Sequence, residues 1–239
     1  MAEPAPNAEL LSSLGRLVRG LSALFWGLPI ALVVCVQAAK GEWLRPLGIF
    51  PPLLATGLLC YGVDLLGHFQ KQERIWRAAL DRTRLFALIN FGLSPFLYWW
   101  NKIPSQPFYN TMIDLMTVTA LMFLLALNPM LHRLAAMLPD ETLRGETNLF
   151  TRLNQVILLI LMTALPFHFL LHSLSKLPRF MVELMLLLDR GGPMLELMLL
   201  MIFILVPVAM TMALLWKTKE TIMNGVFSNV SGVEPPGGS

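Results

Sequence analysis

Four titratable side chains from three apolar segments are the residues of this chain best suited to chemistry. His168 and His172 lie four residues apart in TALPFHFLLHSL, so both rings would share one face of a helix. Two imidazoles at that spacing can bind one metal ion, and the carboxylates of Asp114 and Glu196 could complete the ligand set. The same groups could instead relay protons, because histidine titrates near neutral pH and burial moves a carboxylic acid toward it.

A simpler interpretation of these four side chains needs no ligand. His172 lies close to Lys176, where an apolar segment ends, so its ring can reach the headgroup region of a membrane. A polar group inside a membrane can also make a single hydrogen bond to a neighbouring helix. We favour this interpretation over a proton or ion pathway, and a pathway over a bound metal.

A second candidate pair is Asp64 with His68, which lie one helical turn apart. Haem is a further alternative, because His68 and His132 would lie at a similar depth if both ended neighbouring helices. His168 and His172 share a helix face and cannot both bind one haem axially, and the chain has no CxxCH motif. We expect no cofactor, and metal and haem stay open as alternatives.

The composition indicates that a bilayer supplies much of the solvent around this chain. Of its 239 residues, 56% are hydrophobic and 14% are charged, and the mean hydropathy is +0.64. A soluble domain usually has about 25% charged residues. The net charge of +3 is small, which argues against nucleic-acid binding. The sequence has no GxGxxG, Walker, HExxH or GxSxG motif, so we expect no enzyme activity.

We therefore predict an all-α, polytopic transmembrane bundle of about six spans, because a helix needs about 20 apolar residues to cross a bilayer. The membrane domain covers residues 20–216, between a cytoplasmic segment 1–19 and a cytoplasmic tail 217–239. The third span is the weakest, and Pro95 should kink it. The predicted spans are 20–38, 48–67, 85–100, 108–131, 154–173 and 194–216.

Two further stretches are predicted to lie along the membrane surface. In residues 69–84, a stripe of Ile75, Trp76, Ala79 and Leu80 would face the lipid as an amphipathic helix. An ordinary basic loop is an equal alternative there. Residues 177–190 are apolar but too short to span. The side chains expected to bind anionic headgroups are Lys71, Arg74, Arg77, Arg82 and Arg84.

The distribution of basic residues predicts the orientation of the chain. Lysine and arginine are more frequent in the termini and in loops 68–84 and 132–152 than in the loops on the opposite side. The positive-inside rule then places both termini in the cytoplasm, in a bacterial inner membrane. In this orientation Asp114, Glu196 and the histidine pair all lie in the outer halves of their spans.

Three functions remain open after these observations. The first is a non-catalytic membrane subunit that scaffolds or anchors a larger complex, with the bilayer and other protein subunits as partners. The small size and 15 methionines, many of them in the last third, favour it. The second is a small proton- or ion-coupled transporter or channel that uses Asp114, His168, His172 and Glu196. The third is a redox or metal-dependent membrane enzyme.

Overall fold

The computed structural model is all-α, with no strand in the part of the chain that it describes. Backbone is described for residues 6–69, 73–137, 141–173 and 192–231. Side chains are described for residues 12–69, 73–137, 145, 147–163 and 204–224. The predicted surface helix at residues 177–190 lies outside the described residues.

The helices follow the apolar segments of the sequence. Four of the predicted spans fall within a helix, and the second exceeds α2 by one or two residues at each end. The third is divided between α3 and α4 at Ser94 and Pro95, where the kink was predicted. Several helices extend well beyond the predicted spans, because polar residues continue them at one end. The elements are α1 (Pro6–Lys40), the 3-10 helix η1 (Arg45–Leu47), α2 (Phe50–Leu66), α3 (Arg74–Leu93), α4 (Phe96–Lys102), α5 (Pro107–Ala136), α6 (Glu141–Ser173) and α8 (Gly192–Ser231).

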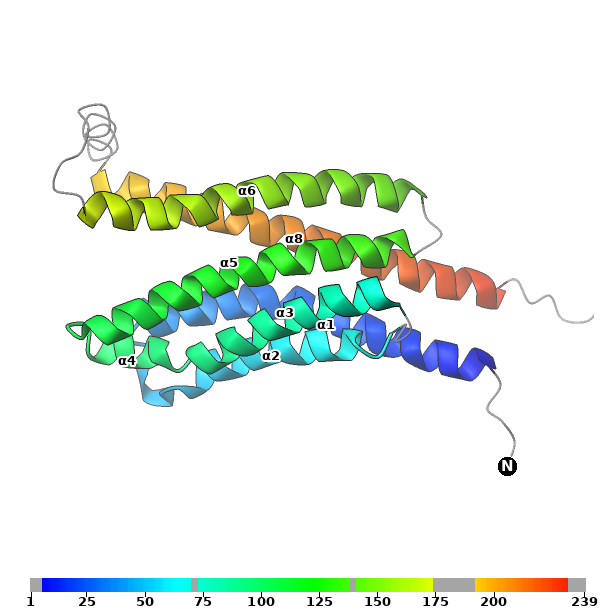
Figure 1. Ribbon diagram of the computed structural model, residues 1–239. Coiled ribbons are helices and arrows are strands. Elements are labelled where there is room, and N and C mark those ends of the chain that lie inside the picture. Colours follow the sequence, from blue (N-terminus) through cyan, green and yellow to red (C-terminus); the bar gives the residue numbers. More distant parts are fainter. Residues whose placement is uncertain (1–5, 70–72, 138–140, 174–191, 232–239) are drawn as a thin grey trace, which may run out of the picture.

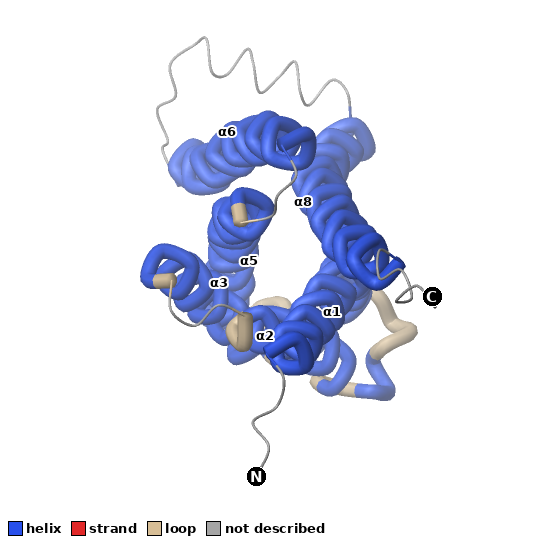
Figure 2. The backbone as a smooth tube through the Cα atoms, turned by 90° about the vertical axis from the view of Figure 1, so that its right-hand side faces the viewer, coloured by secondary structure: helices blue, strands red, loops and turns tan. Residues whose placement is uncertain are grey.

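The six long helices form a ring of neighbours. Going round the bundle, α1 contacts α2, which contacts α3, followed by α5, α6 and α8, and α8 contacts α1 again (Figure 2). A further contact joins α5 to α8 across the ring. The first turns of α1 and the last turns of α8 lie at one end of the bundle, here named the terminal end (Figure 1). The opposite end, which holds η1 and α4, is named the loop end.

The bundle has an apolar core that includes a few uncharged polar side chains, and many large apolar side chains lie on its outer surface. Leucines from all six long helices form the core. The buried polar side chains of the described residues are threonine, asparagine or serine. Exposing large apolar side chains to water is unfavourable, so this outer surface suits an apolar solvent. Apolar side chains that are more than half exposed include Trp26, Leu54, Leu88, Leu149 and Trp216.

Two of the described helices have the length and the hydropathy to cross a membrane. They are Ser12–Lys40 and Pro107–Ala136, in which an 18-residue stretch has a mean hydropathy of 2.0 and 1.7, respectively. α2 is apolar but shorter. Length and hydropathy therefore support membrane association weakly, through α1 and α5.

The predicted boundary between a surface helix ending at residue 84 and a span beginning at residue 85 is wrong. α3 runs without a break from Arg74 to Leu93. Trp76 is 1% exposed and donates from Nε1 to the carbonyl oxygen of Phe69, 3.1 Å away, so it packs in the core of the protein. Ile75, predicted to share its face, is exposed. The buried stripe of α3 is Trp76, Leu80, Thr83, Ala87 and Asn90, which repeats at helical spacing along the whole helix.

α1 and α2 approach closely because glycines face each other across their interface. A Cβ atom added to Gly20 would lie 2.9 Å from the carbonyl oxygen of Gly62. A Cβ added to Gly62 would lie 2.8 Å from Cγ of Leu24. Small residues at such contacts let helix backbones approach, as in membrane helix pairs.

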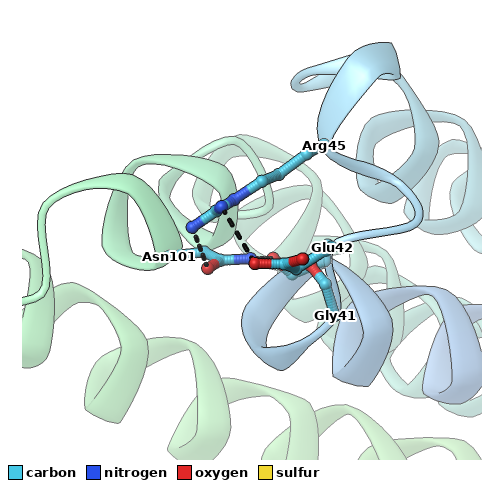
Figure 3. Close-up of polar contacts among 5 residues, drawn as sticks. Gly41, Glu42, Arg45 and Asn101 are labelled. Atoms are coloured by element: carbon cyan, nitrogen blue, oxygen red, sulfur yellow. Dashed lines mark hydrogen bonds and ion pairs between the residues drawn. The ribbon is translucent and has the colours of Figure 1, made fainter.

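Asn101 joins α4 to the C-terminal end of α1 at the loop end. Its Nδ2 donates to the carbonyl oxygens of Ala38 and Gly41, each 3.0 Å away. Its Oδ1 accepts from Nη2 of Arg45 at 3.4 Å, and Arg45 also contacts Glu42 (Figure 3). The carbonyls at the end of α1 therefore obtain donors from a side chain distant in sequence.

Candidate functional site

The predicted outer cluster lies on three helices that are mutual neighbours. α5 carries Asp114, α6 carries His168 and His172, and α8 carries Glu196; each of these helices contacts the other two. Asp114 is partly exposed. The side chains of His168, His172 and Glu196 lie outside the described residues. Contact among the four side chains therefore stays a prediction, although the helix adjacency that it needs is present.

The second candidate pair, Asp64 and His68, lies at the C-terminal end of α2. The carboxylate of Asp64 contacts the guanidinium of Arg84 at 2.6 Å and so joins α2 to α3. Nδ1 of His68 lies 3.2 Å from the backbone carbonyl oxygen of Asp64. Asp64 thus uses its carboxylate to hold a neighbouring helix, because α3 passes beside α2 at this level.

The predicted headgroup-binding residues lie on the exposed side of α3, near the terminal end. Arg74, Arg77, Arg82 and Arg84 are all exposed, and Lys71 lies outside the described residues. Arg84 forms the ion pair with Asp64. Beside it is a recess of about 230 Å³, lined by Cys60, Tyr61, Asp64, Arg84 and Leu88.

A buried polar junction, formed by Asn128 of α5, Asn154 of α6 and Thr211 of α8, lies between three helices. All three side chains are fully buried. Nδ2 of Asn154 donates to Oδ1 of Asn128 at 3.0 Å and to Oγ1 of Thr211 at 2.9 Å. It also lies 3.3 Å from the carbonyl oxygen of Pro207. One side chain therefore holds three helices together.

The surrounding acceptors decide which way the amide of Asn154 points. Thr211 donates its hydroxyl hydrogen to the carbonyl oxygen of Pro207 at 2.8 Å, so it accepts from Asn154. Nδ2 of Asn128 donates to the carbonyl oxygen of Leu124 at 2.8 Å, which turns its Oδ1 toward Asn154. A reversed Asn154 amide would set its oxygen against acceptors. Oδ1 of Asn154 is buried and has no hydrogen-bond partner.

Two threonines continue this polar face of α6 toward the terminal end. Thr147 and Thr151 are 1% and 4% exposed, and neither Oγ1 has a hydrogen-bond partner. With Asn154 they follow a spacing of four and three residues, which puts all three on one face of the helix. Leu158 and Leu161 occupy the same face further along α6 and are also buried.

A second polar contact joins α3 to α5. Oγ1 of Thr119 lies 3.1 Å from Oδ1 of Asn90, and both side chains are buried. Nδ2 of Asn90 donates to the carbonyl oxygen of Phe86 at 2.8 Å. The same residue that weakened the third predicted span therefore stabilises the packing of α3.

The residues of the polar junction carry no charge, so they were not among the site residues predicted from the sequence. A signal for them exists in the sequence. Thr147, Thr151 and Asn154 share a helical face with Leu158 and Leu161, and Asn128 directly precedes a proline inside an apolar run. The pairing of α6 with α5 and α8 is set by tertiary packing, which these local patterns do not contain.

The arrangement of the described polar residues suits hydrogen bonding between helices. Within the described residues, no group of three histidine, cysteine, aspartate or glutamate side chains is placed to hold a metal ion. Cys35 and Cys60 are free thiols on α1 and α2. The chain matches no protein-family model, no curated protein and no solved structure.

Proposed function

We propose that the protein is an integral membrane subunit that crosses the bilayer six times and scaffolds or anchors a larger membrane complex without catalysing a reaction. The distribution of side chains carries this proposal. Uncharged polar groups bond helix to helix inside the bundle, whereas large apolar side chains cover its outside. An outer surface rich in large apolar side chains, around a core whose polar groups bond to one another, suits a protein surrounded by lipid.

The lengths of the helices support a part that projects from the membrane. α1 has 35 residues and α8 has 40, so they extend for about 50 and 60 Å. The hydrocarbon core needs about 30 Å. With the apolar middle of the bundle in the bilayer, the terminal end protrudes as a cap of helices. Such a cap offers a partner more surface than short loops do.

The charge of the terminal end supports an orientation with this cap in the cytoplasm. The same end contains the start of α1 and the end of α8, which fits an even number of crossings (Figure 1). The described basic residues on the parts of the helices nearer this end are Arg16, Arg19, Arg74, Arg77, Arg82, Arg84, Arg133, Lys217 and Lys219.

Single-cysteine labelling tests the membrane topology. In a chain with Cys35→Ala and Cys60→Ala, cysteines replace Ser105 at the loop end and Asn224 near the end of α8, both of which are exposed. An impermeant maleimide added outside sealed cells should label position 105, and position 224 only after permeabilisation. Labelling of both positions from one side, or release of the protein by alkaline carbonate, would contradict the proposal.

Gentle purification tests the scaffolding role. A tagged chain extracted in mild detergent should elute with other subunits at fixed stoichiometry, measured by native mass spectrometry. A tagged unrelated membrane protein prepared in parallel identifies contaminants. A monomer or a homodimer without other subunits would rule out the scaffolding role.

A small proton- or ion-coupled transporter is the second candidate function. The mutual contacts of α5, α6 and α8 favour it, since these helices carry Asp114, His168, His172 and Glu196. Proton flux into vesicles should fall in Asp114→Asn and Glu196→Gln, and should persist in Asp81→Asn, which changes an exposed acid on α3. Equal flux in all the variants and the unaltered chain would exclude this use of the cluster.

A further inference from the structure

We propose that the inner face of α6 binds a short file of water molecules, which runs from Thr147 near the terminal end to Asn154 in the middle of the bundle. This hydrated inlet goes beyond the scaffolding role and concerns the interior of the bundle itself. It is formed by polar groups of α6 that face α5 and α8.

Three buried oxygens without partners carry the proposal. They are Oγ1 of Thr147, Oγ1 of Thr151 and Oδ1 of Asn154. Buried polar atoms in proteins are nearly always paired, either with protein groups or with ordered water. Other buried threonines of this chain follow that rule. Thr83 donates to the carbonyl oxygen of Ala79 at 2.9 Å, and Thr218 donates to that of Leu214 at 2.8 Å.

The spacing of the three oxygens favours several small occupants over one ion. Thr147 and Asn154 are seven residues apart, so their levels along α6 differ by about 10 Å. A single cation could not reach both ends of that distance. Water molecules that are hydrogen-bonded about 2.8 Å apart would need three or four members to cover it.

The chemistry of each oxygen selects an occupant that both donates and accepts hydrogen bonds. Oδ1 of Asn154 is an amide oxygen, which can only accept a hydrogen bond. Each threonine hydroxyl can donate to one neighbour and accept from another. Water satisfies all three groups without adding charge, and none of them is charged.

The proposed file begins at Thr147 and ends at Asn154. Thr147 lies six residues after Glu141, the first residue of α6, and this part of α6 is at the terminal end (Figure 1). Beyond Asn154 the same face continues with Leu158 and Leu161, which are buried apolar side chains. Water therefore enters from the terminal end and stops at the polar junction.

Cysteine accessibility tests this inlet. In the Cys35→Ala, Cys60→Ala chain, Thr147→Cys and Thr151→Cys are compared with Thr83→Cys, which replaces a fully buried, hydrogen-bonded threonine. A small charged methanethiosulfonate reacts with thiolates, which form readily only in contact with water. In the detergent-purified chain we expect positions 147 and 151 to react at least about tenfold faster than position 83. Equal rates at all three positions would overturn the proposal.

Valine substitution gives a second test, which remains informative if a cysteine variant does not fold. Thr151→Val removes the hydroxyl and keeps the shape, and Thr218→Val is the matched control with a satisfied hydroxyl. If water binds Thr151, Thr151→Val should lower Tm by about 2–4 °C, as the loss of the satisfied hydroxyl in Thr218→Val should. If the hydroxyl is dry and unpaired, the substitution should raise Tm, which would contradict hydration.

Replacing sodium and potassium by choline distinguishes water from a bound cation. We expect the Tm of the unaltered chain to stay the same. A Tm that rises with sodium in the unaltered chain but not in Thr151→Val would assign the site to a cation and refute the water file. These readouts use purified protein, so they are independent of the topology and partner experiments.

Discussion

Nδ2 of Asn154 donates a hydrogen bond to Oδ1 of Asn128, 3.0 Å away, across the interface between α6 and α5. The two residues are 26 positions apart, and both side chains are fully buried. Thr211 of α8 contacts both amides. This relationship fixes the rotation of three helices about their axes, since a turned α6 would bury an amide without a partner.

Asn128→Leu should lower the free energy of unfolding by about 1–2 kcal/mol, because it removes the buried hydrogen bond that joins Asn154 of α6 to α5. Asn148→Leu is the matched control on α6, where the same substitution falls at an exposed position. We expect it to change the free energy by less than about 0.5 kcal/mol. Denaturant unfolding in detergent measures both. Equal effects would mean that the junction does not stabilise the bundle.

Gly20→Ala should destabilise the protein by about 1–3 kcal/mol, because the new Cβ would lie 2.9 Å from the carbonyl oxygen of Gly62. Gly15→Ala is the control on the same helix, where an added Cβ has no heavy atom within 4 Å. It should stabilise by about 0.5–1 kcal/mol, since alanine favours the helix over glycine. Tm shifts of opposite sign are therefore expected, and a stabilising Gly20→Ala would refute the close approach of α1 and α2.

The Arg84–Asp64 ion pair should contribute little, although its atoms are 2.6 Å apart. The two side chains are 55% and 48% exposed, so water and salt screen their attraction. A double-mutant cycle with Arg84→Met and Asp64→Asn should give a coupling energy of about 0.2–1 kcal/mol, decreasing with added salt. A coupling that is several times larger and insensitive to salt would indicate a pair shielded from water.

The sequence predicted the apolar middle of each helix better than its ends. Hydropathy responds to lipid-facing residues, so the first span was set at residue 20, whereas α1 begins at Pro6. Likewise, the last span was set to end at residue 216, but α8 continues to Ser231. Those extensions are amphipathic or polar, and their described parts contribute Leu17 and Ile222 to the core.

The residues of the polar junction were harder to predict than the helices that carry them. An asparagine in an apolar run can face lipid, water or another helix, and only the packing of the whole bundle decides among these. Asn90 illustrates this: its polarity weakened the third predicted span, yet its side chain is buried and bonds to Thr119. A search restricted to titratable groups omits such residues.

Asn101→Leu should release α4 from the end of α1. The substitution removes the donor to the carbonyl oxygens of Ala38 and Gly41, and the acceptor for Arg45. Both carbonyls lie at a helix end without intrahelical donors. We therefore expect the free energy of unfolding to fall by about 1–3 kcal/mol. Hydrogen exchange at the amides of residues 41–48 should become faster, since this segment connects α1 to α2.

Arg45→Ala separates the two parts of this prediction. Arg45 is exposed, and its hydrogen bond to Asn101 is 3.4 Å long. Removing this side chain should therefore lower the free energy of unfolding by less than about 0.5 kcal/mol. Exchange in residues 41–48 should then stay close to that of the unaltered chain. If Arg45→Ala accelerates exchange as much as Asn101→Leu does, the exposed guanidinium, and not the amide bonds to the end of α1, holds the loop end together.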